Sequence, residues 1–184
     1  MRLADLNALD DGAAVGAFLR CCGSTRWARA MAAARPFTAV EAMTAAADSR
    51  WWSLDREDWL EAFAAHPKIG ESSGSGGSRR SGGAGRSAGS GGSGWSEQEQ
   101  AGVAGAANRT RRRLAAANRD YEMRFGYIFV VCATGKTADE MLVLLERRLR
   151  HDADEELRIA AGEQQTITQL RLRKLVEQEP DTTS

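Results

Sequence analysis

Residues 125–132 read Phe125-Gly126-Tyr127-Ile128-Phe129-Val130-Val131-Cys132, and this stretch decides the fold class. Its aromatic and β-branched side chains favour a buried strand. One strand cannot form a sheet, however, and no partner strand is visible elsewhere among the 184 residues. We therefore interpret the stretch as an extended buried segment or as part of a helix, and we predict an all-α protein.

Two helix patterns follow this stretch. Thr137-Ala138-Asp139-Glu140 has the spacing of a capping box, in which the first and last side chains bond each other's backbone N–H groups, and an apolar run follows it. This pattern predicts a helix that begins near residue 138. A last helix is predicted over residues 154–177, with Ile159, Ile167 and Leu170 on one apolar stripe.

The residues that precede the stretch are also rich in helix formers. Apolar side chains recur at helical spacing over residues 12–21. Ser96-Glu97-Gln98-Glu99 is a second capping box, which should open a long helix towards Tyr121.

Two further helices are expected between these patterns. Thr38 with Glu41 has the capping-box spacing, and Ser53 is a suitable N-cap for the next helix. That helix should stop at His66, because Pro67 disfavours helical geometry in the residue before it.

The composition shifts sharply between Ser72 and Gly94. Of these 23 residues, 10 are Gly and 8 are Ser, so the segment cannot bury enough apolar surface to offset the entropy of ordering it. We expect a flexible, Gly/Ser-rich disordered loop within a single helical-bundle domain that spans residues 1–184.

The charge and cysteine counts argue against several classes of protein. Lys plus Arg and Asp plus Glu number 25 each, whereas nucleic-acid and membrane-surface proteins usually carry a basic excess. The odd count of three Cys is typical of reduced thiols in a cytoplasm. With two His, a His-rich metal site is nearly excluded, and we expect no metal.

The basic cluster at residues 109–113 is expected to be a solvated helix face. No aromatic stacking pattern accompanies its arginines, so we predict no nucleic-acid partner. No run of about 18 apolar residues occurs, so we also expect no membrane span.

His66 is the first candidate for chemistry. It stands at a predicted helix end, before Pro67-Lys68-Ile69-Gly70, so its ring position should be well defined, as an acid or base requires. A helix C-terminus also favours the protonated ring. The alternative is that His66 is merely a polar residue that closes the helix.

Three other residues are candidates for binding. Glu99 and Gln100 stand at a predicted helix N-terminus, where they could hold a polar or anionic ligand; the alternative is that Glu99 simply bonds back to Ser96. Arg171 follows Ile167 by four residues and should lie beside the apolar stripe. There it either pairs with an internal carboxylate or binds an anionic substrate.

Several motifs together resemble one known family. They are Phe18-Leu19-Arg20-Cys21-Cys22-Gly23-Ser24 with Trp27, Arg35-Pro36-Phe37, His66-Pro67-Lys68-Ile69-Gly70, Trp95-Ser96 with Glu99-Gln100-Ala101-Gly102, Asn118 with Tyr121 and Phe125-Gly126, Phe129-Val130-Val131-Cys132-Ala133, and Leu170-Arg171-Leu172. The family is the 2-oxo-4-hydroxy-4-carboxy-5-ureidoimidazoline (OHCU) decarboxylases of urate degradation, and the resemblance covers all but the Gly/Ser-rich segment.

The resemblance implies an all-helical lyase that needs no cofactor. Such a carboxy-lyase would convert the small molecule OHCU to (S)-allantoin and carbon dioxide in the cytoplasm, as a homodimer or a monomer. A non-catalytic helical binding module of the same fold is the alternative, and the joint presence of His66, Glu99 and Gln100 favours the enzyme.

The resemblance also implies roles for individual residues. The catalytic pair maps onto His66 and Glu99. The residues expected to bind substrate are Pro67, Ser96, Glu97, Gln98, Gln100, main-chain groups of Phe129, Val130, Val131, Cys132 and Ala133, and Arg171.

Overall fold

The computed structural model describes residues 1–67 and 93–177, with side chains described from residue 108 onward in the second part. This part of the chain contains helices and no strand. The helices are α1 (Leu3–Ala8), α2 (Asp11–Cys21), α3 (Thr25–Ala33), α4 (Val40–Trp52), α5 (Arg56–Ala64), α6 (Ser93–Phe125), α7 (Ala138–Arg148) and α8 (Ala153–Val176). The predicted all-α class is therefore confirmed.

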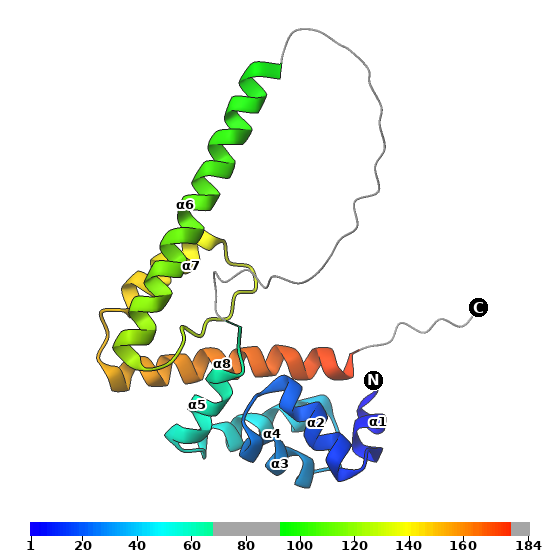
Figure 1. The fold of residues 1–184 in the computed structure, drawn as a ribbon. Coiled ribbons are helices and arrows are strands. Elements are labelled where there is room, and N and C mark those ends of the chain that lie inside the picture. Colours follow the sequence, from blue (N-terminus) through cyan, green and yellow to red (C-terminus); the bar gives the residue numbers. More distant parts are fainter. Residues whose placement is uncertain (68–92, 178–184) are drawn as a thin grey trace, which may run out of the picture.

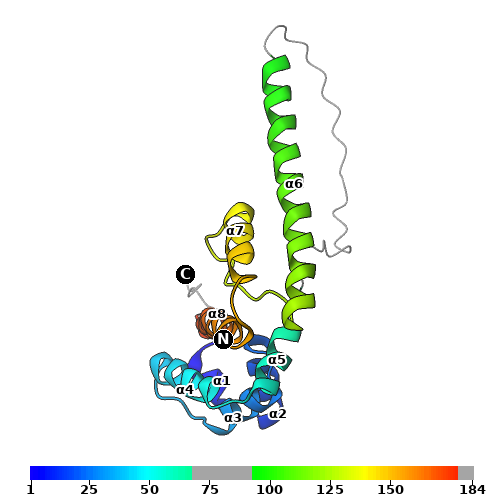
Figure 2. The ribbon, with the colours of Figure 1, turned by 90° about the vertical axis from the view of Figure 1, so that its left-hand side faces the viewer.

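Helix α8 lies between two groups of helices. Helices α1 to α5 cluster on one side of it, and α6 and α7 pack against each other on the other side (Figures 1 and 2). Of the first group, α2, α4 and α5 contact α8 directly. The N-terminal half of α6 extends beyond the remaining helices in both views. Residues that reach out from α8 can therefore touch both groups.

The face that α8 buries differs from the predicted stripe. Its buried residues are Glu156, Leu157, Ala160, Ala161, Gln164, Thr168 and Leu172. Ile159 and Ile167 are only half-buried, and Leu170 is exposed, so the predicted phase of this helix was wrong. The prediction counted apolar side chains alone, whereas three of the buried residues are polar.

Local capping signals predicted some helix ends and misplaced others. The Thr137–Glu140 capping box is confirmed, because the Thr137 hydroxyl accepts from the Glu140 N–H and the Glu140 carboxylate accepts from the Thr137 N–H. The Thr38–Glu41 box was wrong, since α4 begins at Val40 and its N-cap, Ala39, makes no side-chain bond.

The next predicted cap was also wrong. Ser53 ends α4 and bonds back to the Arg50 carbonyl, whereas the Asp55 carboxylate caps α5 by accepting from the Asp58 N–H. Helix α5 ends at Ala64, two residues earlier than predicted.

Two other boundaries concern the long helix. It begins at Ser93 instead of Ser96 and runs past Tyr121 to Phe125. Residues 72–92 of the predicted Gly/Ser loop lie outside the described residues, while residues 93–94 belong to α6. The single-domain boundary of 1–184 stays a prediction.

The segment that joins α6 to α7 is extended and mostly buried, as one of the two interpretations of residues 125–132 predicted. Tyr127, Phe129, Val130, Val131 and Cys132 are all buried, yet no described segment pairs with them as a strand. The rings of Tyr127 and Phe129 pack against Tyr121 of α6 at centroid distances of 5.8 and 5.3 Å. Packing of these aromatic side chains thus helps to hold the extended segment in place without a neighbouring strand.

A buried ion pair between Arg148 and Glu156 also holds the extended segment in place. Nη2 of Arg148 lies 2.6 Å from Oε1 of Glu156, and both residues are buried. Nη1 of Arg148 donates to the carbonyl of Val130 at 2.8 Å, so α7 holds the extended segment by its backbone. The Tyr121 hydroxyl and Nδ1 of His151 also contact the Glu156 carboxylate. Burial raises the pKa of the Tyr121 phenol, which stays protonated and donates to Glu156.

The basic cluster has the predicted exposure. Arg109, Arg111, Arg112 and Arg113 are exposed on α6, and Arg113 pairs with Glu146 of α7 at 2.7 Å. Within the two described parts of the chain, no helix is long and apolar enough to cross a membrane.

We expect Glu156→Gln to destabilise the protein by about 3–5 kcal/mol, because it leaves the Arg148 charge buried without its carboxylate. Urea unfolding measures this as a lower midpoint at unchanged slope. Glu146→Gln is the matched control: it breaks an exposed pair and should cost less than about 1 kcal/mol. Equal losses in the two variants would show that the buried pair carries no special share of the stability.

Candidate active site

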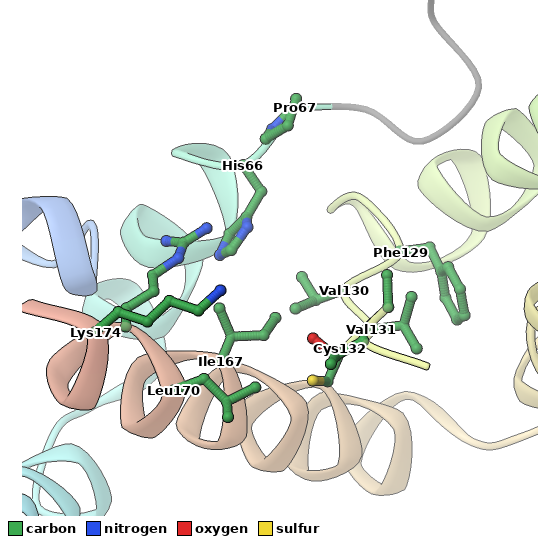
Figure 3. Close-up of a pocket in the computed structure, with 12 residues that line it drawn as sticks. His66, Pro67, Phe129, Val130, Val131, Cys132, Ile167, Leu170 and Lys174 are labelled. Carbon is green, nitrogen blue, oxygen red and sulfur yellow. The ribbon is translucent and has the colours of Figure 1, made fainter. Parts of the chain in front are cut away.

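A pocket of about 310 Å³ opens between the end of α5, the extended segment and α8 (Figure 3). Its walls are formed by His66, Pro67, Phe129, Val130, Val131, Cys132, Ala133, Thr134, Ile167, Leu170, Arg171 and Lys174. The two apolar residues that the stripe prediction misassigned, Ile167 and Leu170, thus face this pocket. The predicted main-chain residues 129–133 all line it.

His66 reaches the pocket because α5 ends early and packs closely on the α2–α3 turn. Its N–H donates to the Phe63 carbonyl at 3.1 Å, which closes the last turn of the helix. A Cβ at Gly23 would stand 2.3 Å from the Cβ of Ala65, so only glycine at position 23 permits this approach. The residue before His66 is thereby held against the turn that follows α2.

The His66 ring points toward α8 and has one defined partner there (Figure 3). Its Nε2 lies 2.5 Å from Oε1 of Gln164, a fully buried residue. Burial lowers the pKa of His66 below its usual value of 6.5, and the nearby Arg171 charge lowers it further, although the bond to Gln164 opposes both. Burial thus acts against the effect of the helix C-terminus, which favours the protonated ring. At neutral pH His66 is uncharged and can accept a proton.

Arg171 and Lys174 make one side of the pocket positive. Arg171 is half-buried, and its Nη1 donates to the Cys21 carbonyl at 3.4 Å. No carboxylate among the residues with described side chains pairs with it, so the predicted pairing with an internal carboxylate is not seen in this part of the chain. Lys174 extends from α8 into the same space (Figure 3). An anionic ligand would therefore be attracted to this wall.

Several backbone N–H and C=O groups of the extended segment already make hydrogen bonds to side chains of other residues. The Val130 carbonyl accepts from Arg148, and the Cys132 N–H donates to Oε2 of Glu163 at 2.7 Å. The Cys132 carbonyl accepts from Nζ of Lys136 at 2.8 Å. Successive residues of an extended chain point their backbone groups to opposite sides. Val131 also lines the pocket, and its peptide groups make no bond to another described residue.

The predicted residues of the second capping box cannot be placed in the pocket. Ser96, Glu97, Gln98, Glu99 and Gln100 belong to α6, but their side chains lie outside the described residues. The structure brings His66 and Arg171 together at one pocket. The roles of these two and of the five residues in α6 stay predictions.

Sequence reasoning missed three residues that shape this site: Glu163, Gln164 and Lys174. Lys174 is exposed, yet it also lines the pocket. A signal was present, because Gln164, Ile167, Arg171 and Lys174 follow one another at spacings of three or four residues on one helix face. Among the residues whose side chains are described, no cluster of three metal-binding side chains occurs.

Comparisons with known proteins identify the relatives of this chain. The sequence model of the family described as OHCU decarboxylase matches residues 7–173. The Arabidopsis thaliana uric acid degradation bifunctional protein TTL is 39% identical over 159 residues, which are 84% of this chain and 45% of that protein. The chain thus spans less than half of this bifunctional relative.

Other relatives match along nearly their whole length. The 2-oxo-4-hydroxy-4-carboxy-5-ureidoimidazoline decarboxylase of Haloferax volcanii is 27% identical over 173 residues, which are 94% of each chain. A crystal structure of OHCU decarboxylase in the presence of (S)-allantoin superposes on this chain with a TM-score of 0.66, and the two sequences are 35% identical. The match covers 86% of this chain and 96% of the chain in that crystal structure.

We expect the His66 ring to titrate below 6.5 and its pKa to rise in Arg171→Met, because the Arg171 charge disfavours the protonated ring. NMR titration of the two histidines measures this, with Arg112→Met, an exposed arginine on α6, as the control. A His66 pKa at or above 6.5 in the unmodified protein would contradict the prediction.

The same shift fixes the sign of a stability effect. Between the folded pKa of His66 and 6.5, the unfolded chain binds more protons than the folded one. The contribution of this group to stability is therefore present above 6.5 and is lost as the pH falls through the folded pKa.

Proposed function

The chain belongs to the OHCU decarboxylase family, and we propose that it converts OHCU to (S)-allantoin and carbon dioxide in urate degradation. The observation that carries the proposal is the pairing of an uncharged His66 with the positive wall of Arg171 and Lys174 in one pocket. The substrate is a small anion rich in amide groups, and the pocket offers a cationic side, a proton acceptor and peptide groups.

The reaction begins at the ring carbon that bears the hydroxyl and the carboxylate. The bond to the carboxylate breaks, carbon dioxide leaves, and the electron pair forms a double bond to the neighbouring ureido-bearing carbon. The π electrons of the adjacent C=N bond move to nitrogen, which takes a proton. The resulting enol gives up its hydroxyl proton and gains a proton on the ureido-bearing carbon, which produces the carbonyl of allantoin.

His66 suits the proton transfers in this sequence. As an uncharged imidazole it accepts the hydroxyl proton, and as the resulting imidazolium it delivers a proton to carbon. Delivery from one side of the ring would produce a single enantiomer. Glu99, in the proposed role, orients His66 or accepts hydrogen bonds from the hydroxyl and ureido groups of the substrate.

The positive wall has to favour the transition state over the substrate. A cation that contacts only the leaving carboxylate stabilises the ground state and slows the reaction. Arg171 and Lys174 accelerate the reaction if they face the ring atoms on which negative charge develops. Pro67, residues 96–98, Gln100 and the peptide groups of residues 129–133 complete the proposed binding surface.

The proposal includes a cytoplasmic enzyme that uses no cofactor. A homodimer is one assembly consistent with it and a monomer is the other; sedimentation equilibrium distinguishes them.

Activity is tested with OHCU made in the cuvette from urate by urate oxidase and hydroxyisourate hydrolase. Adding this protein should speed the appearance of a one-handed allantoin signal in circular dichroism. We expect His66→Asn to lower kcat by about 100-fold or more, the usual range for a lost acid–base group. Glu99→Gln in the same assay tests the second catalytic residue.

The control is Arg113→Gln, which alters an exposed pair on α6 and should leave the rate unchanged. Thermal unfolding checks that each variant is folded. If the unmodified protein gives only the slow racemic decay of OHCU, the proposal is wrong and a binding module of the same fold remains.

A further inference from the structure

Gln164 stands at the centre of a chain of hydrogen bonds that ends at His66. It is fully buried on α8 and does not line the pocket beside His66. Its Nε2 donates to the Thr168 hydroxyl oxygen at 3.1 Å, and its Oε1 lies 2.5 Å from Nε2 of His66. Both ends of this amide are therefore used, and each end has a different chemical character.

The contact with Thr168 defines the orientation of the amide. The Gln164 NH₂ group is the donor in this contact, and the Thr168 hydroxyl oxygen is the acceptor. A hydroxyl oxygen can accept a hydrogen bond whatever the direction of its own hydrogen.

This direction carries through to the histidine. Since the Gln164 NH₂ group is turned towards Thr168, the carbonyl oxygen of the same amide faces Nε2 of His66. A carbonyl oxygen can only accept, so Nε2 must carry a hydrogen. An uncharged imidazole has one N–H, which leaves Nδ1 with a lone pair. Among the described residues, no hydrogen bond to Nδ1 is recorded.

We propose that Gln164 is a positioning residue that holds the His66 ring in the tautomer with hydrogen on Nε2, so that Nδ1 is the atom that exchanges protons with the substrate. The role in turnover rests on the proposed function. The tautomer itself is a property of the free protein, and it can be measured whether or not the protein is a decarboxylase.

The two ring nitrogens of His66 are distinguished by ¹⁵N NMR at a pH where the ring is uncharged. In the unmodified protein we expect a protonated Nε2 and an unprotonated Nδ1. Gln164→Leu removes the acceptor at similar size and should give a mixture of tautomers. Gln165→Leu is the matched control: the same change one residue along removes a bond to the exposed Trp52 and should leave the tautomer as it is.

A second variant covers the case in which Gln164→Leu fails to fold. Thr168→Val removes the oxygen that orients the amide, so the Gln164 NH₂ group can turn to Nε2 and shift the hydrogen of His66 to Nδ1. This substitution keeps the shape of the side chain, and thermal unfolding checks the fold.

Gln164→Glu tests the contact between residue 164 and Nε2 by a different readout. A carboxylate also accepts from Nε2, so the tautomer is kept, but its charge should raise the pKa of His66 and move the acidic limb of the pH–rate profile upward. An unchanged acidic limb would show that residue 164 does not act on the proton of His66 and would count against the positioning role.

The kinetic expectation is a loss in kcat rather than in KM. Gln164→Leu and Thr168→Val should lower kcat by about tenfold or more, because His66 rings with hydrogen on Nδ1 cannot accept a proton from the substrate at that atom. KM should change little. An unprotonated Nε2 in the unmodified protein would overturn the inference. The predicted tautomer in a protein without activity would leave it standing while the proposed function fails.

Discussion

The ion pair between Arg148 and Glu156 is the interaction on which the pocket depends. Residues 126–137 form no described strand pairing, so an extended buried segment has to be held by side chains. Arg148 holds it through the Val130 carbonyl, and Glu156 holds Arg148. The cost of burying both charges is offset because the carboxylate also contacts Tyr121 and His151, so few of its acceptor sites remain unused. The position of the extended segment, which forms one wall of the pocket, therefore depends on two charged residues that do not line the pocket.

Helix α8 joins this wall to the catalytic candidate. Glu163 accepts from the Cys132 N–H, while its neighbour Gln164 contacts His66. Adjacent residues of a helix point about 100° apart, so one turn of α8 reaches the two opposite walls of the pocket at once. A rotation of α8 would alter both contacts together. The contact with His66 gives a reason for polar residues on the buried face at Gln164 and Thr168, since an apolar side chain at 164 could not bond the histidine ring.

Features that depend on residues close together in the sequence could be predicted, whereas features that depend on distant residues could not. The Thr137–Glu140 capping box depends on four consecutive residues, and it was predicted correctly. The phase of α8 was not, because the partner that makes Gln164 a buried residue lies 98 positions away in the sequence. Ile167 and Leu170 remained partly exposed for the same reason: they line a pocket whose other walls come from distant segments. Position and spacing alone made His66 and Arg171 candidates but left each with a plain structural alternative, and the family resemblance then favoured a functional role.

Charge and burial together explain how His66 can respond to a substrate. In the free protein, burial and the Arg171 charge both keep the ring unprotonated. On the proposed function, an anion bound against Arg171 and Lys174 offsets the positive charge that His66 experiences. The ring then becomes a stronger base at the moment when a proton has to be accepted. Binding of the anion would thus also activate the base, and Arg171 is suited to this role because no carboxylate of the described residues pairs with it.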